Sequence, residues 1–308
     1  MKPTCLVCSR LVPMPFVGRT FAPRELVGCL KNRSWLHPQV RLSRITLREF
    51  VWNPLPGHLP VQPADDRVYV HVVVRGRAHL LRTGEVLEAG DAVIARSFRA
   101  TLESEALAIV GDHDALALRL DERLLAPPPG AHATLALPVQ TIRDLHDRFG
   151  AARADHEAAQ VCDDLVATLR AAGVSCELPE RGRMSTAREG DAALAAGLTR
   201  AMTVESMRPG FDDLRAEGLT MTDRHLRRRV GDFFRRFGMP FGRWLEMRQS
   251  FCLTTAALAM SAPRARTDTV ARASGFASPT SLCHALQRTG LASPQALAAG
   301  ARELRRNL

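Results

Sequence analysis

The chain has 308 residues, which suggests about two domains, and its hydrophobic content of 46% is enough for packed cores. The formal net charge is +10, and roughly 16 arginines against roughly 8 acidic residues fall within residues 211–308. This excess indicates an anionic partner, either nucleic acid or an anionic membrane surface. The sequence contains no apolar run of about 18 residues, and its proline-broken start lacks a signal-peptide core. We therefore exclude a membrane span and expect a cytoplasmic protein.

The first segment is expected to be an N-terminal arm. Residues 1–36 are rich in Pro and Arg and have no clear period. Cys5 and Cys8 have the CxxC spacing of a metal or redox site, but no second pair and no nearby histidine accompanies them. We interpret both as reduced cysteines and expect no cofactor.

Short β-branched runs separated by turn residues follow the arm. Residues 67–81 are β-branched and alternating, with a glycine at a tight turn. Residues 83–95 again predict two strands joined by a Gly-Asp turn, and residues 105–120 predict two strands around GDHD. Strands at this spacing predict a small antiparallel barrel or sandwich. Over residues 139–173 the apolar spacing becomes three and four, which predicts one or two helices.

These patterns predict an α+β protein with two domains. The first domain spans residues 37–173 and combines the strands with the helices after them. A polar stretch with Pro and Gly over residues 174–190 is typical of a linker. Residues 191–308 read as helical throughout, so the second domain is expected to be all-α.

A strongly basic helix begins near Thr222. Residues 222–238 read TDRHLRRRVGDFFRRFG, in which Thr222 suits an N-cap and Asp223 suits the first turn. The inward apolar stripe is Leu226, Val230 and Phe233 or Phe234. The same phasing turns outward Arg224, Arg227 and Arg228. Arginines in this position suit a recognition helix in a major groove, where they reach guanine or phosphate; the alternative is a solvated basic face.

A second helix-turn-helix pattern follows in residues 268–290. Asp268 to Ser274 predicts a short helix, and Gly275 suits a turn that requires positive φ. Ser278 is placed to cap the next helix with Pro279 at its first position. The inward residues of that helix are Leu282 and Leu286. Its outward set is Thr280, Ser281, Cys283 and His284, which either read bases or lie on the surface.

Three segments, in this order and spacing, resemble the AraC/XylS family of bacterial transcription regulators. The first recognition element of that family is similar to residues 219–230, LTMTDRHLRRRV. Its long linker helix is similar to residues 244–263, WLEMRQSFCLTTAALAMSAP. Its second recognition element is similar to residues 267–297, TDTVARASGFASPTSLCHALQRTGLASPQAL. The resemblance implies two helix-turn-helix motifs in the C-terminal domain. It also implies an N-terminal cupin-like β-barrel that binds an effector or dimerises, and VYVHVVVRGRAHLLRTGEVLEAGDAVIA (68–95) is similar to that domain.

The resemblance implies a sequence-specific DNA-binding regulator, an activator rather than an enzyme. Its partners would be promoter DNA, RNA polymerase, a second copy of the chain through the helices before residue 173, and a small-molecule effector. The expected DNA-binding residues are Asp223, Arg224, Arg227, Arg228, Arg235, Arg236, Pro279, Thr280, Ser281, Cys283, His284 and Arg288. We expect Arg235 and Arg236 to contact phosphates, or nothing, rather than bases. No effector-binding residue is assigned, because one sequence does not fix strand register.

Two other classes compete with this interpretation. A cupin-type enzyme would hold a metal in the barrel, and His71 and His79 are its candidate ligands, with His113 as a weaker one. The first two are eight residues apart, and Glu85 and Glu88 do not complete the usual pattern, so we expect packed or surface histidines and no metal. A scaffold that uses its basic helices on an anionic membrane would bind DNA without sequence preference.

Overall fold

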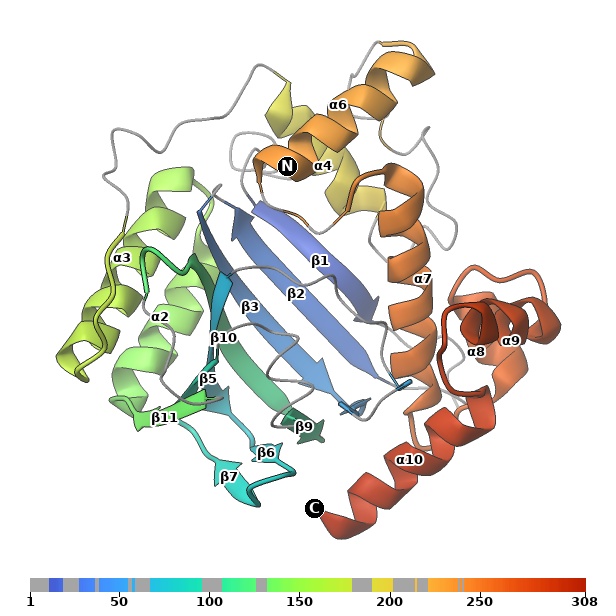
Figure 1. Ribbon diagram of the computed structural model, residues 1–308, viewed down its shortest axis with the longest axis horizontal. Helices are drawn as coiled ribbons and strands as arrows, with labels where there is room; N and C mark the ends of the chain where they lie inside the picture. The colour runs from blue at the N-terminus through green and yellow to red at the C-terminus, as the bar shows by residue number, and fades with distance from the viewer. Residues whose placement is uncertain are drawn as a thin grey trace.

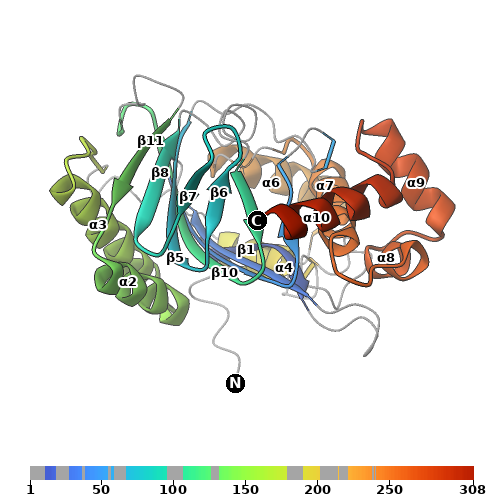
Figure 2. The same ribbon diagram turned by 90° about the horizontal axis from the view of Figure 1, so that it is seen from below.

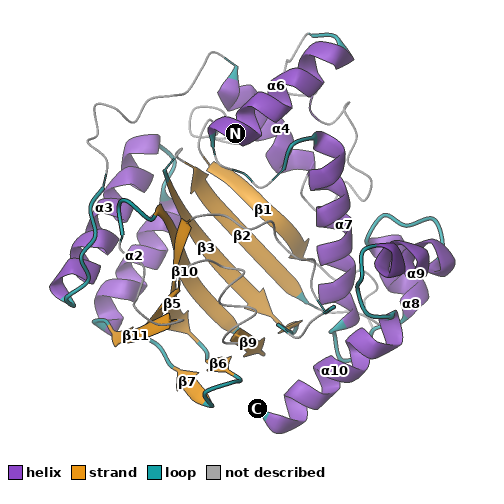
Figure 3. Ribbon diagram, viewed as in Figure 1, coloured by secondary structure: helices purple, strands orange, loops and turns teal. Residues whose placement is uncertain are grey.

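The structure is a computed structural model that describes residues 11–18, 28–36, 39–54, 57–58, 67–95, 107–125, 132–178, 190–201, 214, 221–237, 239 and 241–308. The strands precede the helices along the chain. Figure 3 distinguishes the strands from the helices by colour. The strands are β1 (Leu11–Gly18), β2 (Cys29–Leu36), β3 (Val40–Arg48), β4 (Val51–Trp52), β5 (Arg67–Arg75), β6 (Ala78–Leu80), β7 (Glu85–Leu87), β8 (Asp91–Ala95), β9 (Leu107–Val110), β10 (His113–Asp121) and β11 (His132–Ala136). The helices are α2 (Val139–Ala151), α3 (Asp155–Ala171), α4 (Asp191–Ala201), α6 (Asp223–Arg236), α7 (Trp244–Met260), α8 (Thr267–Ala273), α9 (Pro279–Arg288) and α10 (Pro294–Asn307).

The strands form two antiparallel sheets. The larger has seven strands in the order β1-β2-β3-β10-β5-β8-β11, and the smaller has four in the order β4-β9-β6-β7. Leu47 and Val73 of the larger sheet share a hydrophobic cluster with Leu80 and Ile109 of the smaller one, so the two sheets pack face to face. This arrangement confirms the predicted antiparallel N-terminal domain followed by C-terminal helices.

Strict alternation gives the larger sheet two different faces. In β5, Val68, Val70 and Val72 join a cluster with α2 and α3, whereas Tyr69 and His71 turn to the opposite, interior face. The two helices cover the outer face of the sheet, as Figures 1 and 2 show. The predicted helical stretch 139–173 is therefore two helices.

The expected N-terminal arm is partly wrong. Within residues 1–36, β1 and β2 are strands of the larger sheet, and β2 pairs along its length with β3. Strand β2 was not predicted from the sequence, because its interior-facing residues are a mixture of apolar and polar types: Leu30, Asn32, Ser34 and Leu36. The CxxC pair Cys5 and Cys8 lies outside the described residues, as does most of the expected linker.

The C-terminal helices contact the strands directly. Leu36 of β2 packs with α4, α6 and the first part of α7, while the second part of α7, α8 and α9 share a cluster with both sheets. Helix α7 runs beside β1 and joins the two groups of helices (Figure 1). Over the described ranges, no helix has the length and apolar character that crossing a membrane requires.

Candidate nucleic-acid interface and interior cavity

Helix α6 is capped and buried as its sequence predicts. The hydroxyl of Thr222 accepts a hydrogen bond from the backbone N–H of His225 at 3.5 Å, and Asp223 occupies the first turn. The buried residues of the helix are Leu226, Val230, Phe233 and Phe234. They pack with Trp244 and Phe251 of α7, which fixes the rotation of α6 about its axis.

That rotation leaves a basic stripe exposed. Arg224, Arg228 and Arg235 lie on one face of α6 because they are spaced by four and seven residues, and all three are exposed. Arg227 is exposed on the flank. An open groove of about 1000 Å³ follows this face; its described lining is Met221, His225, Arg227, Arg228, Arg229, Gly231, Asp232, Arg235, Phe241 and Gly242.

Arg236 differs from its neighbour Arg235 and corrects one expected site residue. Its side chain is only 12% exposed, and its guanidinium forms a bidentate ion pair with the fully buried Asp191 of α4. This pairing raises the pKa of Arg236. The sequence pattern did not reveal the role, because Asp191 lies 45 residues away along the chain. Arg236 therefore holds α6 to α4 and is withdrawn from the expected DNA contacts.

The first helix of the expected first motif, residues 211–218, lies outside the described residues except for Leu214. Leu214 is fully buried in the cluster that contains Leu226 and Val230 of α6.

The second motif consists of α8, a turn and α9. Gly275 in the turn has φ +81°. Ser278 caps α9: its hydroxyl accepts from the N–H of Ser281 at 3.1 Å, and the hydroxyl of Ser281 accepts from the N–H of Ser278 at 3.0 Å. The inward placement of Leu282 and Leu286 is confirmed.

The outer surface of α9 is polar rather than basic. The exposed members of the expected set are Pro279, Thr280, Cys283, His284 and Arg288. Ser281 is half-buried, and its hydroxyl also donates to the carbonyl of Ser278 at 2.8 Å. The cap uses the donor and one of the two acceptor sites of this hydroxyl, and base reading by Ser281 stays a prediction.

Three hydrogen bonds among the described residues join the segments that flank the second motif to the region around β4. The N–H of Val51 in β4 donates to the hydroxyl of Ser261 after α7, at 2.8 Å. The N–H of Ala292, before α10, donates to the carbonyl of Gly57 at 2.7 Å. Arg305 of α10 donates to the carbonyl of Glu49 at 2.7 Å. None of these contacts was predicted, because they join residues more than 200 positions apart.

A cavity of about 120 Å³ lies between the interior face of the larger sheet and α7. Its polar end is formed by two neighbouring rows across β3, β10 and β5. The first row consists of Arg41 on β3, Arg119 on β10 and Tyr69 on β5. The second row consists of Ser43, Ala117 and His71 on the same three strands. Its apolar walls include Ile45, Leu47, Leu107 and Ile109 from the strands, and α7 contributes Met247, Ser250, Phe251 and Thr254.

A chain of buried hydrogen bonds lies behind the polar end. The hydroxyl of Tyr69 is 3.1 Å from Nδ1 of His71, and Nε2 of His71 is 3.1 Å from Nε2 of His113. Burial lowers the pKa of His71 to about 3 and the pKa of His113 to about 4, so both imidazoles are neutral near pH 7. One ring therefore donates its Nε2 proton to the other.

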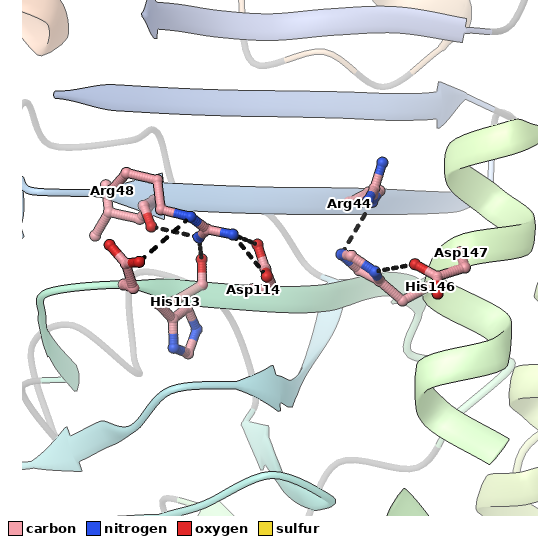
Figure 4. A network of polar contacts seen from close by, with 8 residues as sticks. Arg44, Arg48, His113, Asp114, His146 and Asp147 are labelled. Carbon is pink, nitrogen blue, oxygen red and sulfur yellow. Dashed lines mark hydrogen bonds and ion pairs between the residues drawn. The ribbon is translucent and has the colours of Figure 1, made fainter. Parts of the chain in front are cut away.

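Arg48 fixes the position of this pair. Its guanidinium bonds both carboxylate oxygens of Asp114 at 2.8 Å and the carbonyl of His113 at 3.0 Å, which holds β3 against β10 (Figure 4). Farther along β3, Arg44 turns to the outer face and donates to Nε2 of His146 at 2.9 Å (Figure 4).

The structure separates the two expected metal candidates. His71 is buried in the larger sheet beside His113, whereas His79 is partly exposed in β6 of the smaller sheet. Among the described residues, no group of three or more His, Cys, Asp or Glu side chains is arranged to hold a metal ion. The pairing of His71 with His113 came from strand register, which the sequence did not reveal.

No protein-family model matches this sequence. No curated protein matches it either. Among solved structures, apo ToxT from Vibrio cholerae is similar at 10% identity and a TM-score of 0.32, covering 84% of this chain and 97% of its own. The AraC-like transcriptional activator CuxR is similar at 11% identity and a TM-score of 0.29, and the match covers 88% of this chain and 85% of CuxR. AerE from Microcystis aeruginosa is similar with a TM-score of 0.25 and 11% identity, and the match covers 42% of this chain and 56% of AerE. Because these TM-scores are low, the function is argued from the residues of this chain.

Proposed function

We propose that this chain is a sequence-specific DNA-binding transcription activator of the AraC type, which works in the cytoplasm. The observation that carries the proposal is the exposed arginine stripe of α6, held outward by a buried apolar stripe on the opposite side. Arginine forks fit guanine edges and phosphates in a major groove. A second capped helix, α9, follows at the other end of α7.

The length of α7 supports reading by both helices. Its 17 residues span about 25 Å at 1.5 Å per residue. Helix α6 precedes α7 and α9 follows it, so the two would meet successive major-groove segments along one side of a duplex. The basic α6 would supply most of the affinity, and Thr280, His284 and Arg288 of α9 would add polar contacts.

The strands and the helices α2 and α3 would control this DNA binding. We assign the interior cavity to a small-molecule effector, because α7 forms one of its walls. We assign α2 and α3 to homodimer formation, which would place four reading helices on one promoter. RNA polymerase would be the partner of the DNA-bound dimer.

The test is selection of DNA fragments from a random pool by the purified chain at moderate salt. The parent is expected to enrich one shared sequence, and the triple substitution of Arg224, Arg227 and Arg228 by Ala is expected to lose it. Arg82→Ala is the control, because Arg82 is exposed in the turn between β6 and β7, outside α6, α9 and the helices assigned to dimer formation.

Uniform, salt-sensitive recovery of every fragment by the parent would refute sequence-specific reading. In that case binding to anionic lipid vesicles at the same salt, abolished by the triple substitution, would identify the membrane-surface alternative.

A further inference from the structure

Residues 49–54 and 57–58, which include β4, form a strap that contacts α10 along its length. The guanidinium of Arg305, near the end of α10, donates to the carbonyl of Glu49 at 2.7 Å. Val51 is buried in one cluster with the apolar side of α10. Polar and apolar contacts therefore hold the second half of α10 on the strap.

The contact extends to the start and the middle of α10. The N–H of Ala292, just before the helix, donates to the carbonyl of Gly57 at 2.7 Å. A Cβ atom added at Gly300 would lie 2.7 Å from Nε2 of His58 and 2.9 Å from Nδ2 of Asn53, closer than Cβ atoms come in folded proteins. The glycine at position 300 thus lets α10 lie directly against the strap.

Helix α10 belongs to the same core as the second motif. Leu297 of α10 packs in one cluster with Leu282 and Leu286 of α9 and with the second part of α7. Helix α10 runs from α8 and α9 towards the strands (Figures 1 and 2). The strap is therefore a second support for α9, in addition to α7.

Helix α6 is tied to the strands at a different place. Arg236 pairs with Asp191 of α4, and α4 contacts β1. Leu36 of β2 packs in one cluster with Leu226 of α6. Because α6 and α9 both depend on the strands, the distance and the angle between them depend on the strap as well as on α7.

Two helices in one fixed relative position match only one spacing on DNA. Each added base pair moves the second DNA segment by about 3.4 Å and rotates it by about 35° around the duplex axis. A second motif supported by α7 alone would be free to turn about residues 261–266, which join α7 to α8, and to follow such a change.

We propose that the strap sets the spacing between the two DNA segments that the chain reads. It acts through α10, and Gly300 and Arg305 are its positioning residues on that helix. This inference rests on the proposed function, because the spacing has a meaning only if both α6 and α9 contact one duplex.

The first experiment measures binding of the full chain to the selected DNA sequence with and without one base pair inserted between its two halves. In the parent the insertion is expected to weaken binding about tenfold or more. In the double variant Gly300→Leu with Arg305→Ala it is expected to weaken binding less than about threefold, and the uninserted duplex is expected to bind more weakly than to the parent, because preorganisation is lost.

The matched control is the double variant Ala299→Leu with Arg302→Ala. It adds the same bulk and removes the same charge on α10, but both positions are exposed and the parent spacing preference should remain. Arg305→Ala alone loses only the bond to Glu49 and should shift the preference partway, which keeps the test open if Gly300→Leu does not fold. Circular dichroism checks the fold of each variant.

The second experiment needs no DNA. Spin labels introduced as encoded amino acids at Arg235 of α6 and Gln287 of α9, both exposed, report the distance between the two helices by double electron–electron resonance. The parent and the control are expected to give one narrow distance distribution. The variant Gly300→Leu with Arg305→Ala is expected to give a broad one.

Three results would overturn the proposal: the same spacing discrimination in parent and variant, tighter DNA binding by the variant, or an unchanged distance distribution. Tighter binding would show that the strap holds the second motif away from DNA. A parent that enriches one sequence but tolerates every spacing would keep the proposed function and reject the role of the strap. A parent that enriches no shared sequence would reject the proposed function, and the distance measurement would still decide whether the strap fixes α9 relative to α6.

Discussion

Arg236 of α6 and Asp191 of α4 form two hydrogen bonds, Nη1 to Oδ2 and Nη2 to Oδ1, each 2.7 Å long. Asp191 is fully buried, and Arg236 also bonds Asp232 one turn earlier in α6. Arg229 lies at the edge of the same cluster, with Nη2 4.0 Å from Oδ1 of Asp191. One carboxylate thus anchors α6, while the arginines on the other face stay exposed.

Asp191→Ala is expected to lower the free energy of unfolding by about 3–5 kcal/mol, because it leaves a mostly buried guanidinium without its carboxylate. Urea denaturation at pH 7 measures this change. Arg235→Ala removes an exposed ion pair with Asp232 and is expected to cost less than about 1 kcal/mol. If the two substitutions cost the same, the buried pair does not anchor α6.

Arg228→Ala is expected to weaken binding to the selected DNA sequence by about 1–3 kcal/mol. If Arg228 reads a base, the preference at one position relaxes; if it contacts a phosphate, affinity falls on all sequences and the salt dependence becomes shallower. Fluorescence anisotropy at several salt concentrations distinguishes the two. Unchanged affinity on every sequence would remove Arg228 from the interface.

Ser261→Ala is expected to destabilise the chain by about 1–3 kcal/mol, because the buried N–H of Val51 loses its acceptor. Thr255→Val is the matched control on the neighbouring helix. The hydroxyl of Thr255 is buried without a hydrogen-bond partner within the described structure, so its removal is expected to be neutral or stabilising. Chemical denaturation measures both, and equal effects would show that the β4 contact contributes nothing.

The stability of the chain is expected to fall as the pH drops from about 6.5 towards 4. Burial lowers the pKa of His71 and His113 to about 3 and about 4, so the unfolded chain takes up protons in this range and the folded chain does not. Each pH unit costs up to about 1.4 kcal/mol per histidine. Urea denaturation at pH 7 and 5 checks this slope.

His113→Gln should reduce the pH dependence, because it removes one of the buried histidines whose pKa is lowered by burial. His284→Gln changes an exposed histidine on α9 and should leave the slope unchanged. A slope that stays the same in His113→Gln would show that the buried pair is not responsible.

Local pattern determined the helices and their orientation. The caps Thr222 and Ser278 and the inward stripes of α6 and α9 depend on neighbours within one or two turns, so they could be predicted. The alternation of residues 67–81 likewise predicted strands. It did not reveal β2, whose interior face mixes apolar and polar residues, and residues 1–36 were therefore assigned to an arm.

Only the tertiary structure decided which residues meet. Strand register placed Arg41 opposite Arg119 and His71 beside His113, because a pairing contact depends on residues far apart in the chain. Adjacent arginines of α6 received different roles for the same reason, since Asp191 reaches Arg236 and not Arg235. The sequence by itself determined a basic, outward-facing helix within an all-helical C-terminal part. The folded arrangement decided which of its charges are exposed and where a cavity meets α7.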